Sequence, residues 1–159
     1  MRLNKKILAM ALIVLLLPIV FLASCQKEID VGAIIGTNEL PTSLMYVTYV
    51  FDVSKLENVV GYNDYVFIGK VEKYIKTDYS SDFGIPQTEY LVKVMENIKG
   101  GLVNDIRLIK DGGINKEQNS FIINEKDLLP KVGDIYFFST YSLKDGTLIA
   151  GSGPNSNIQ

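Results

Sequence analysis

The 159-residue sequence contains no histidine, no tryptophan and only one cysteine. Without histidine, the chain lacks the usual general base near neutral pH and the commonest metal ligand, and a Ser-His-Asp triad is excluded. With one cysteine, it can form neither an internal disulfide nor a zinc site built on several cysteines. We therefore expect a folded part that uses no cofactor.

Charge is also missing from a long stretch near the N terminus. No charged residue lies between Lys6 and Lys27, and residues 7–21 are apolar except for Pro18. Three basic residues precede this stretch. A basic start, an apolar run and small residues before a cleavage position are the parts of a secretory signal.

The apolar run ends in a pattern typical of bacterial lipoprotein processing sites, which consists of Leu22, Ala23, Ser24 and Cys25. We expect a signal peptidase to cut between Ser24 and Cys25, and diacylglycerol to be attached to the Cys25 sulfur. A single acyl chain binds membranes only marginally, whereas two chains hold a protein durably. The predicted membrane partner is therefore the lipid on Cys25, and the predicted location is the outer face of the cell membrane.

Two alternatives remain for this N terminus. Residues 7–23 make a run of 17, and a membrane-spanning helix needs about 17–25 residues. Pro18 and the Ser24-Cys25 pair favour cleavage over such an uncut anchor. An ordinary signal followed by release of a protein with a free thiol is the other alternative.

Removing the signal changes the charge of the chain. Three of the 16 basic residues and none of the 18 acidic ones precede Cys25, so 13 basic and 18 acidic residues remain, with a net charge of −5. This balance argues against a nucleic-acid partner. We divide the chain into a signal peptide (1–24), a lipidated cysteine and tether (25–45), one β-barrel domain (46–151) and a flexible tail (152–159).

Alternation of apolar and polar residues predicts mostly strands. A short helix is expected at 52–61, begun by Asp52 or Ser54 and ended by Gly61. Gly69 suggests a β-bulge, residues 76–87 a long polar loop, and residues 46–51 are strand-like only in composition. The expected main strands are 65–75, 88–98, 105–110, 120–123, 135–141 and 147–150. Because one helix cannot cover a flat sheet, we predict a small, antiparallel, partly open barrel of five to six strands, OB-like, with one short helix.

Three runs resemble a known family. They are Tyr65–Val71, Thr88–Val94 followed by Ile98-Lys99-Gly100, and Val132–Phe138. They resemble bacterial secreted proteins related to tissue inhibitors of metalloproteinases and netrin modules, and this resemblance implies an OB-type barrel. The inhibitory mechanism of the animal proteins, which uses a free N-terminal cysteine and disulfides, is not carried over, because Cys25 would carry lipid and no second cysteine exists.

Three groups of side chains offer candidate chemistry, and for each the plainer interpretation is favoured. Acids flanking the long loop could bind a hard cation, but they lack a calcium-loop spacing and are expected to be solvated. A basic stripe could bind an anionic wall polymer, although acids interleave with it. Tyrosines could stack on a sugar or a peptide, or simply lie at the rim of the core. These groups are Asp78, Asp82 and Glu89; Lys70, Lys73, Lys93, Arg107 and Lys110; and Tyr46, Tyr49, Tyr62, Tyr65 and Tyr79.

These observations lead to three hypotheses for function. The first is a non-enzymatic, lipid-anchored binding domain outside the cell membrane, whose partner is a surface protein, a peptide or a wall polymer. The second is a protective lipoprotein that sequesters a peptide toxin or inhibits a protease. The third is a hydrolase that uses paired carboxylates, which requires two acids converging in a cleft. No ligand-binding residue can be assigned from the sequence.

Overall fold

The computed structural model describes residues 40–79, 85–115 and 120–159. The predicted signal peptide, Cys25 and residues 26–39 of the predicted tether therefore lie outside the described residues. Within the described residues, every helix is too short or too polar to cross a bilayer.

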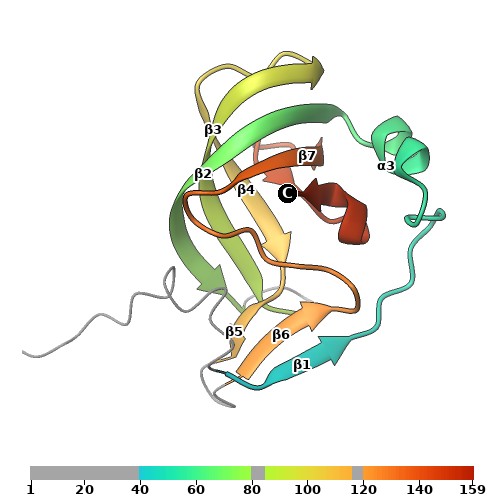
Figure 1. Cartoon of the computed structure of the whole chain (residues 1–159), viewed down its shortest axis with the longest axis vertical. Coiled ribbons are helices and arrows are strands. Elements are labelled where there is room, and N and C mark those ends of the chain that lie inside the picture. Colours follow the sequence, from blue (N-terminus) through green and yellow to red (C-terminus); the bar gives the residue numbers. More distant parts are fainter. Residues whose placement is uncertain (1–39, 80–84, 116–119) are drawn as a thin grey trace, which may run out of the picture. The chain divides into compact units, whose positions relative to one another are not determined.

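Five strands neighbour one another around an almost complete ring (Figure 1). The sheet curls back on itself because β2 pairs with β3 along one edge and with β7 along the other. Its weakest join is between β4 and β8, where only Leu108 and Ile109 pair with Leu148 and Ile149. In order around the ring the strands are β2 (Tyr65–Asp78), β3 (Gln87–Lys99), β4 (Asp105–Asp111), β8 (Leu148–Ile149) and β7 (Ile135–Ser142).

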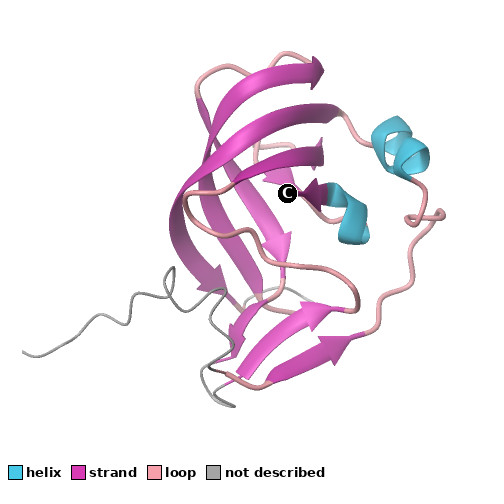
Figure 2. Ribbon diagram, viewed as in Figure 1, coloured by secondary structure: helices cyan, strands magenta, loops and turns pink. Residues whose placement is uncertain are grey.

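The other elements lie around this ring. β9 (Asn157–Ile158) pairs with β7 and is the sixth strand of the sheet. A second sheet has the order β1-β6-β5 and consists of β1 (Thr42–Met45), β6 (Ser120–Asn124) and β5 (Gly113–Asn115). Figure 2 shows the two helical segments, α3 (Leu56–Tyr62) and the 3-10 turn η1 (Gly153–Ser156).

Alternation along the strands places the core inside the ring. On β3, Tyr90 and Val92 are fully buried, whereas Lys93 between Val92 and Val94 is exposed. The rings of Phe67 and Phe138, which lie opposite each other on the neighbouring strands β2 and β7, have centroids 5.3 Å apart and are both fully buried. A smaller cluster of Ile114, Phe121 and Leu129 lies beside the second sheet.

The expected bulge at Gly69 is confirmed. The register of β2 against β3 shifts between Ile68 and Gly69. A Cβ atom built on Gly69 would lie 2.7 Å from Cγ1 of Val92 and 2.9 Å from the Phe67 ring. Glycine therefore allows the strand to bend over its own core at this position.

The predicted fold class is confirmed at the coarse level: the described residues are mainly β, contain one short α-helix and include a partly closed sheet. The expectation of purely antiparallel pairing is wrong, because β1 runs parallel to β6 and β4 runs parallel to β8. The expected loop at 76–87 is also shorter than predicted, because β2 continues to Asp78 and β3 begins at Gln87.

Two predicted boundaries are wrong in the described part of the chain. Residues 152–159 do not form a flexible tail, because they contain η1 and β9 and bury Ser156 and Asn157. The predicted tether includes β1, whose four residues pair with Phe121 to Asn124. Residues 46–51 form no strand. Each of these outcomes depends on partners far away in the sequence.

The helix exists but lies later than predicted. Asp52 accepts a hydrogen bond from the Ser54 amide at 3.0 Å, which makes a turn before the helix rather than a cap on it. Gly61 is inside the helix, which ends where the amide of Asn63 donates to the Val59 carbonyl.

Candidate functional site

The predicted processing site, made of Leu22, Ala23, Ser24 and Cys25, lies outside the described residues. Its lipidation therefore stays a prediction.

The three candidate acids do not form a site in the described part of the chain. Asp78 pairs with Lys76 at 3.2 Å, and Glu89 is almost fully buried where it accepts a hydrogen bond from Nε of Arg107. Asp82 is not among the described residues. Within the described ranges, no three acidic or cysteine side chains come together as metal ligands.

The predicted basic stripe is only partly formed. Strand register places Lys70 beside Lys93, and Lys73 beside Leu91, which pairs with Arg107. Acids also lie in this region, since Glu72 is 3.5 Å from Lys70, Glu89 binds Arg107 and Asp105 lies opposite Lys93. The outer face of β2, β3 and β4 is therefore mixed in charge, and the fifth member, Lys110, is buried instead of exposed.

The candidate tyrosines occupy different environments. Tyr46, Tyr62 and Tyr79 are exposed, whereas Tyr65 packs against the core under Gly100. Tyr49 is half-buried, and burial together with the charges of Asp127 and Asp111 raises its pKa to about 12.

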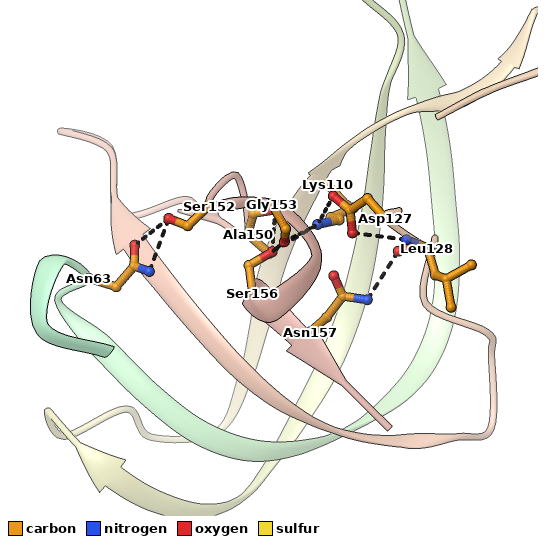
Figure 3. A network of polar contacts seen from close by, with 9 residues as sticks. All are labelled: Asn63, Lys110, Asp127, Leu128, Ala150, Ser152, Gly153, Ser156 and Asn157. Carbon is orange, nitrogen blue, oxygen red and sulfur yellow. Dashed lines mark hydrogen bonds and ion pairs between the residues drawn. The ribbon is translucent and has the colours of Figure 1, made fainter. Parts of the chain in front are cut away.

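Sequence reasoning missed a buried polar network in the gap between β4 and β7, shown in Figure 3. At its centre the ammonium of Lys110 lies 2.6 Å from a carboxylate oxygen of Asp127. Both side chains are at most 2% exposed. Burial lowers the pKa of Lys110, and the Asp127 carboxylate opposes that shift. The sequence contained one indication that Lys110 is buried. In the alternation along β4, Lys110 falls on the same inward-facing side as Ile106 and Leu108.

The same ammonium holds the C-terminal segment in place. Lys110 Nζ donates a hydrogen bond to Ser156 Oγ at 2.8 Å. The Ser156 hydroxyl is in turn the donor to the Gly153 carbonyl at 2.7 Å and to the Ala150 carbonyl at 3.2 Å. Close by, the Asn157 side-chain amide donates to the Leu128 carbonyl at 3.0 Å. These bonds secure η1 and β9 where β4 and β7 do not pair directly.

A serine beside a lysine can be a catalytic pair, so this arrangement must be weighed as an active site. A nucleophile must reach substrate, but Ser156 is completely buried. The Lys110 ammonium is likewise enclosed, because it is bonded to Asp127 and Ser156 and is 1% exposed. The geometry therefore serves structure rather than nucleophilic catalysis.

A second buried network centres on Asn63. Its side-chain nitrogen donates to the Val59 carbonyl at 2.9 Å, to Ser139 Oγ at 3.0 Å and to Ser152 Oγ at 3.1 Å. The end of α3, the middle of β7 and the residue before η1 are thereby joined at one amide. Figure 3 shows its contact with Ser152.

Among the exposed apolar side chains of the described residues, two groups lie close together along the chain. The first, which we call the strap, is residues 44–51, with exposed Leu44, Tyr46, Val47 and Val50. Tyr46 is 79% exposed and Val50 86% exposed. The strap is fixed to α3 by the rings of Phe51 and Tyr62, whose centroids are 4.5 Å apart.

The second surface, which we call the hairpin end, consists of Met95, Ile98 and Val103 around the β3–β4 turn. This turn is braced from within, because the Asn97 side chain donates to the Leu102 carbonyl at 2.8 Å and accepts from the Leu102 amide at 3.0 Å.

The end of β3 is also tied to the helix. The Lys99 ammonium donates to the Val60 carbonyl at 3.0 Å and to the Asn63 carbonyl at 2.5 Å. A cation at the C-terminal end of a helix is the favourable arrangement for the helix dipole. The hairpin end is therefore an apolar surface on a rigid support.

No family model and no curated protein matches the chain.

Proposed function

We propose that this protein is a lipid-anchored binding domain, without enzymatic activity, held at the outer face of a bacterial cell membrane. The hairpin end is the observation that carries the proposal, and the partner is a protein or peptide with an apolar contact surface.

The anchor is proposed from the sequence. A basic start, an apolar run and the Leu22–Cys25 pattern support processing as a lipoprotein. Two acyl chains on Cys25 would hold the folded part at the membrane without any membrane-spanning segment in it.

We also propose that the ring is an OB-type barrel, as the resemblance to netrin-like modules implies. Support comes from its five strands, from the pairing of β2 with both β3 and β7, and from the short join between β4 and β8. Such a partly open, five-stranded barrel is a scaffold that binds ligands through its faces and loops.

The absence of catalysis is proposed from the environment of the reactive groups. Lys110, Asp127 and Ser156 come together in the described residues, but all three side chains are buried away from solvent. The Glu89 carboxylate forms an ion pair with Arg107.

Binding is proposed from the hairpin end. Apolar side chains that protrude from a braced turn lose little conformational freedom when a partner covers them, and this favours affinity. Val103 is 75% exposed and Met95 and Ile98 are each more than half exposed. β3 extends beyond its pairing with β4, which ends where Lys93 lies opposite Asp105 (Figure 1).

The anchor is tested by expressing the full chain and its Cys25→Ala variant in a bacterium and separating membranes from soluble protein. We expect the wild-type chain in the membrane fraction, with mass spectrometry showing diacylglycerol on Cys25, and the variant outside that fraction. An intact Met1 and an unmodified thiol would contradict the anchor.

The binding surface is tested by cross-linking in intact cells, followed by capture of the full chain and mass spectrometry. We expect one cell-surface protein or peptide to be enriched with the wild-type chain and to be lost with Val103→Asp. Leu128→Asp is the matched control, because Leu128 is 71% exposed and lies outside the hairpin end. Equal enrichment with both variants would contradict the assignment.

A further inference from the structure

We propose that the strap lies on the membrane that carries the anchor and inserts its apolar side chains into the outer leaflet. This inference rests on the proposed anchoring at Cys25, but it concerns a different surface from the hairpin end.

The composition of the strap suits a bilayer interface. Residues 40–51 contain no charged side chain, although acidic and basic residues occur through the rest of the folded part. Exposed within this stretch are one leucine, one tyrosine and two valines, namely Leu44, Tyr46, Val47 and Val50. Tyrosine is enriched where lipid meets water, because its ring is apolar and its hydroxyl is polar.

The position of the strap in the chain keeps it close to the lipid. Residues 26–39 separate Cys25 from Leu40, where the described structure begins. Fifteen residue steps reach at most about 54 Å when fully extended. The strap follows immediately, so it is the first exposed apolar surface within the described residues that the anchor would hold near the bilayer. Because the anchor makes this contact intramolecular, a weak tendency to partition is enough to populate the inserted state.

Charge argues for apolar insertion instead of headgroup attraction. The chain from Cys25 onward has 13 basic and 18 acidic residues, so anionic headgroups repel it on average. The strap presents no charge to be repelled and no charge to be buried. Membrane contact through residues 44–51 therefore costs no desolvation of an ionic group.

The lack of tryptophan in the chain gives a direct test. A Tyr46→Trp substitution introduces a single tryptophan at an exposed position. The full-length gene carrying it is expressed in a bacterium, and the membrane-associated product is purified in detergent and reconstituted into phosphatidylethanolamine–phosphatidylglycerol vesicles with or without brominated acyl chains. We expect a blue-shifted tryptophan emission that brominated lipid quenches. Ile135→Trp, on the outside of β7, is the reference and is expected to stay unquenched.

A matched pair of valines then tests the strap itself. Val47 is 42% exposed and Val132, on the loop before β7, is 41% exposed. In a protein that also carries Tyr46→Trp, the Val47→Asp substitution is expected to lower the ratio of inserted to free strap about tenfold. The quenching by brominated lipid should then be relieved. Val132→Asp is expected to leave the quenching unchanged.

The outcomes separate this inference from the anchor. If the protein stays on the vesicles but the Tyr46→Trp emission is neither shifted nor quenched, membrane docking by the strap is wrong and the anchor stands. Equal quenching in the Val47→Asp and Val132→Asp proteins also overturns it. A protein that leaves the vesicles altogether overturns the anchor and, with it, the docking.

Discussion

Lys110 and Asp127 form an ion pair with 2.6 Å between ammonium nitrogen and carboxylate oxygen, and the protein covers both side chains. The attraction of such a pair roughly balances the cost of removing both charges from water, so the pair adds little net stability. Removing one partner is different, because it leaves the other charge buried alone.

This asymmetry predicts the behaviour of variants of the pair. Lys110→Met is expected to lower the free energy of unfolding by about 3–5 kcal/mol, as measured by urea denaturation. Adding Asp127→Asn removes the stranded charge and keeps an acceptor for the Leu128 amide, so the double variant is expected to recover most of the loss. Lys73→Met, at an exposed position, is the control and is expected to change stability by less than about 0.5 kcal/mol. A double variant as unstable as Lys110→Met would contradict the ion pair.

Two buried tyrosines predict opposite effects of removing a hydroxyl. The Tyr90 hydroxyl has no hydrogen-bond partner among the described residues, whereas the Tyr136 hydroxyl accepts from the Lys131 amide at 3.0 Å. Tyr90→Phe is therefore expected to raise the free energy of unfolding by about 1 kcal/mol, and Tyr136→Phe to lower it by about 1 kcal/mol. Thermal or urea unfolding at neutral pH measures both, and destabilisation by Tyr90→Phe would show that its hydroxyl is satisfied.

Tyr90 also predicts a loss of stability in alkali. Burial raises the pKa of Tyr90 well above 10.0, so the native state keeps a proton that the unfolded chain releases near pH 10. This contribution to stability is fully present below pH 10 and is lost as the pH rises towards the native pKa. The free energy of unfolding, measured from about pH 8 to about pH 11, should therefore fall less steeply with pH for Tyr90→Phe than for wild type. Identical slopes would contradict this pKa shift.

Two glycines predict opposite effects of adding one methyl group. Gly69→Ala would place its Cβ 2.7 Å from Val92 Cγ1, so it is expected to destabilise the protein by about 1–3 kcal/mol. Gly61 is inside α3 and has no atom within 4 Å of a built Cβ, so Gly61→Ala is expected to stabilise the protein by about 0.5–1 kcal/mol. Melting temperatures of the two variants give the comparison. A harmless Gly69→Ala would mean that the bulge does not depend on glycine.

The Asn63 amide predicts coupling between the helix and the C-terminal segment. Asn63→Ala leaves Ser139, Ser152 and the Val59 carbonyl without their common donor, and we expect a loss of about 2–3 kcal/mol. Hydrogen exchange should accelerate both in α3 and in η1. Asn58→Ala, which loses one exposed bond to the Asp52 carbonyl, is the control and is expected to cost about 0.5 kcal/mol. Faster exchange in α3 alone would show that the two elements are not coupled.

Local patterns in the sequence predicted most of the ring. Alternation located β3 and β4 to within a residue or two, and Gly69 indicated the bulge. The polar turn at residues 144–146 predicted the β7–β8 hairpin, which is closed by the Leu143 amide bonding to the Thr147 carbonyl. These features depend on neighbours along the chain, so a single sequence reveals them.

The features that the sequence did not predict depend on distant partners. Residues 152–159 have the composition of a frayed end, yet Ser156 is fixed by Lys110, 46 residues away. Thr42 to Met45 become a strand only because β6 lies beside them. Its charge predicts a surface position for Lys110, although its place in the alternation of β4 points inward. Nothing in the local sequence indicates Asp127 as its counterion.

The location of η1 and β9 has a consequence for synthesis and export. The ring begins at Tyr65, but the gap beside β7 is filled only by residues 153–158. If the chain is exported as proposed, this gap stays unfilled until residues 153–158 have crossed the membrane. Under that proposal, the domain is completed only on the side where the protein is proposed to act.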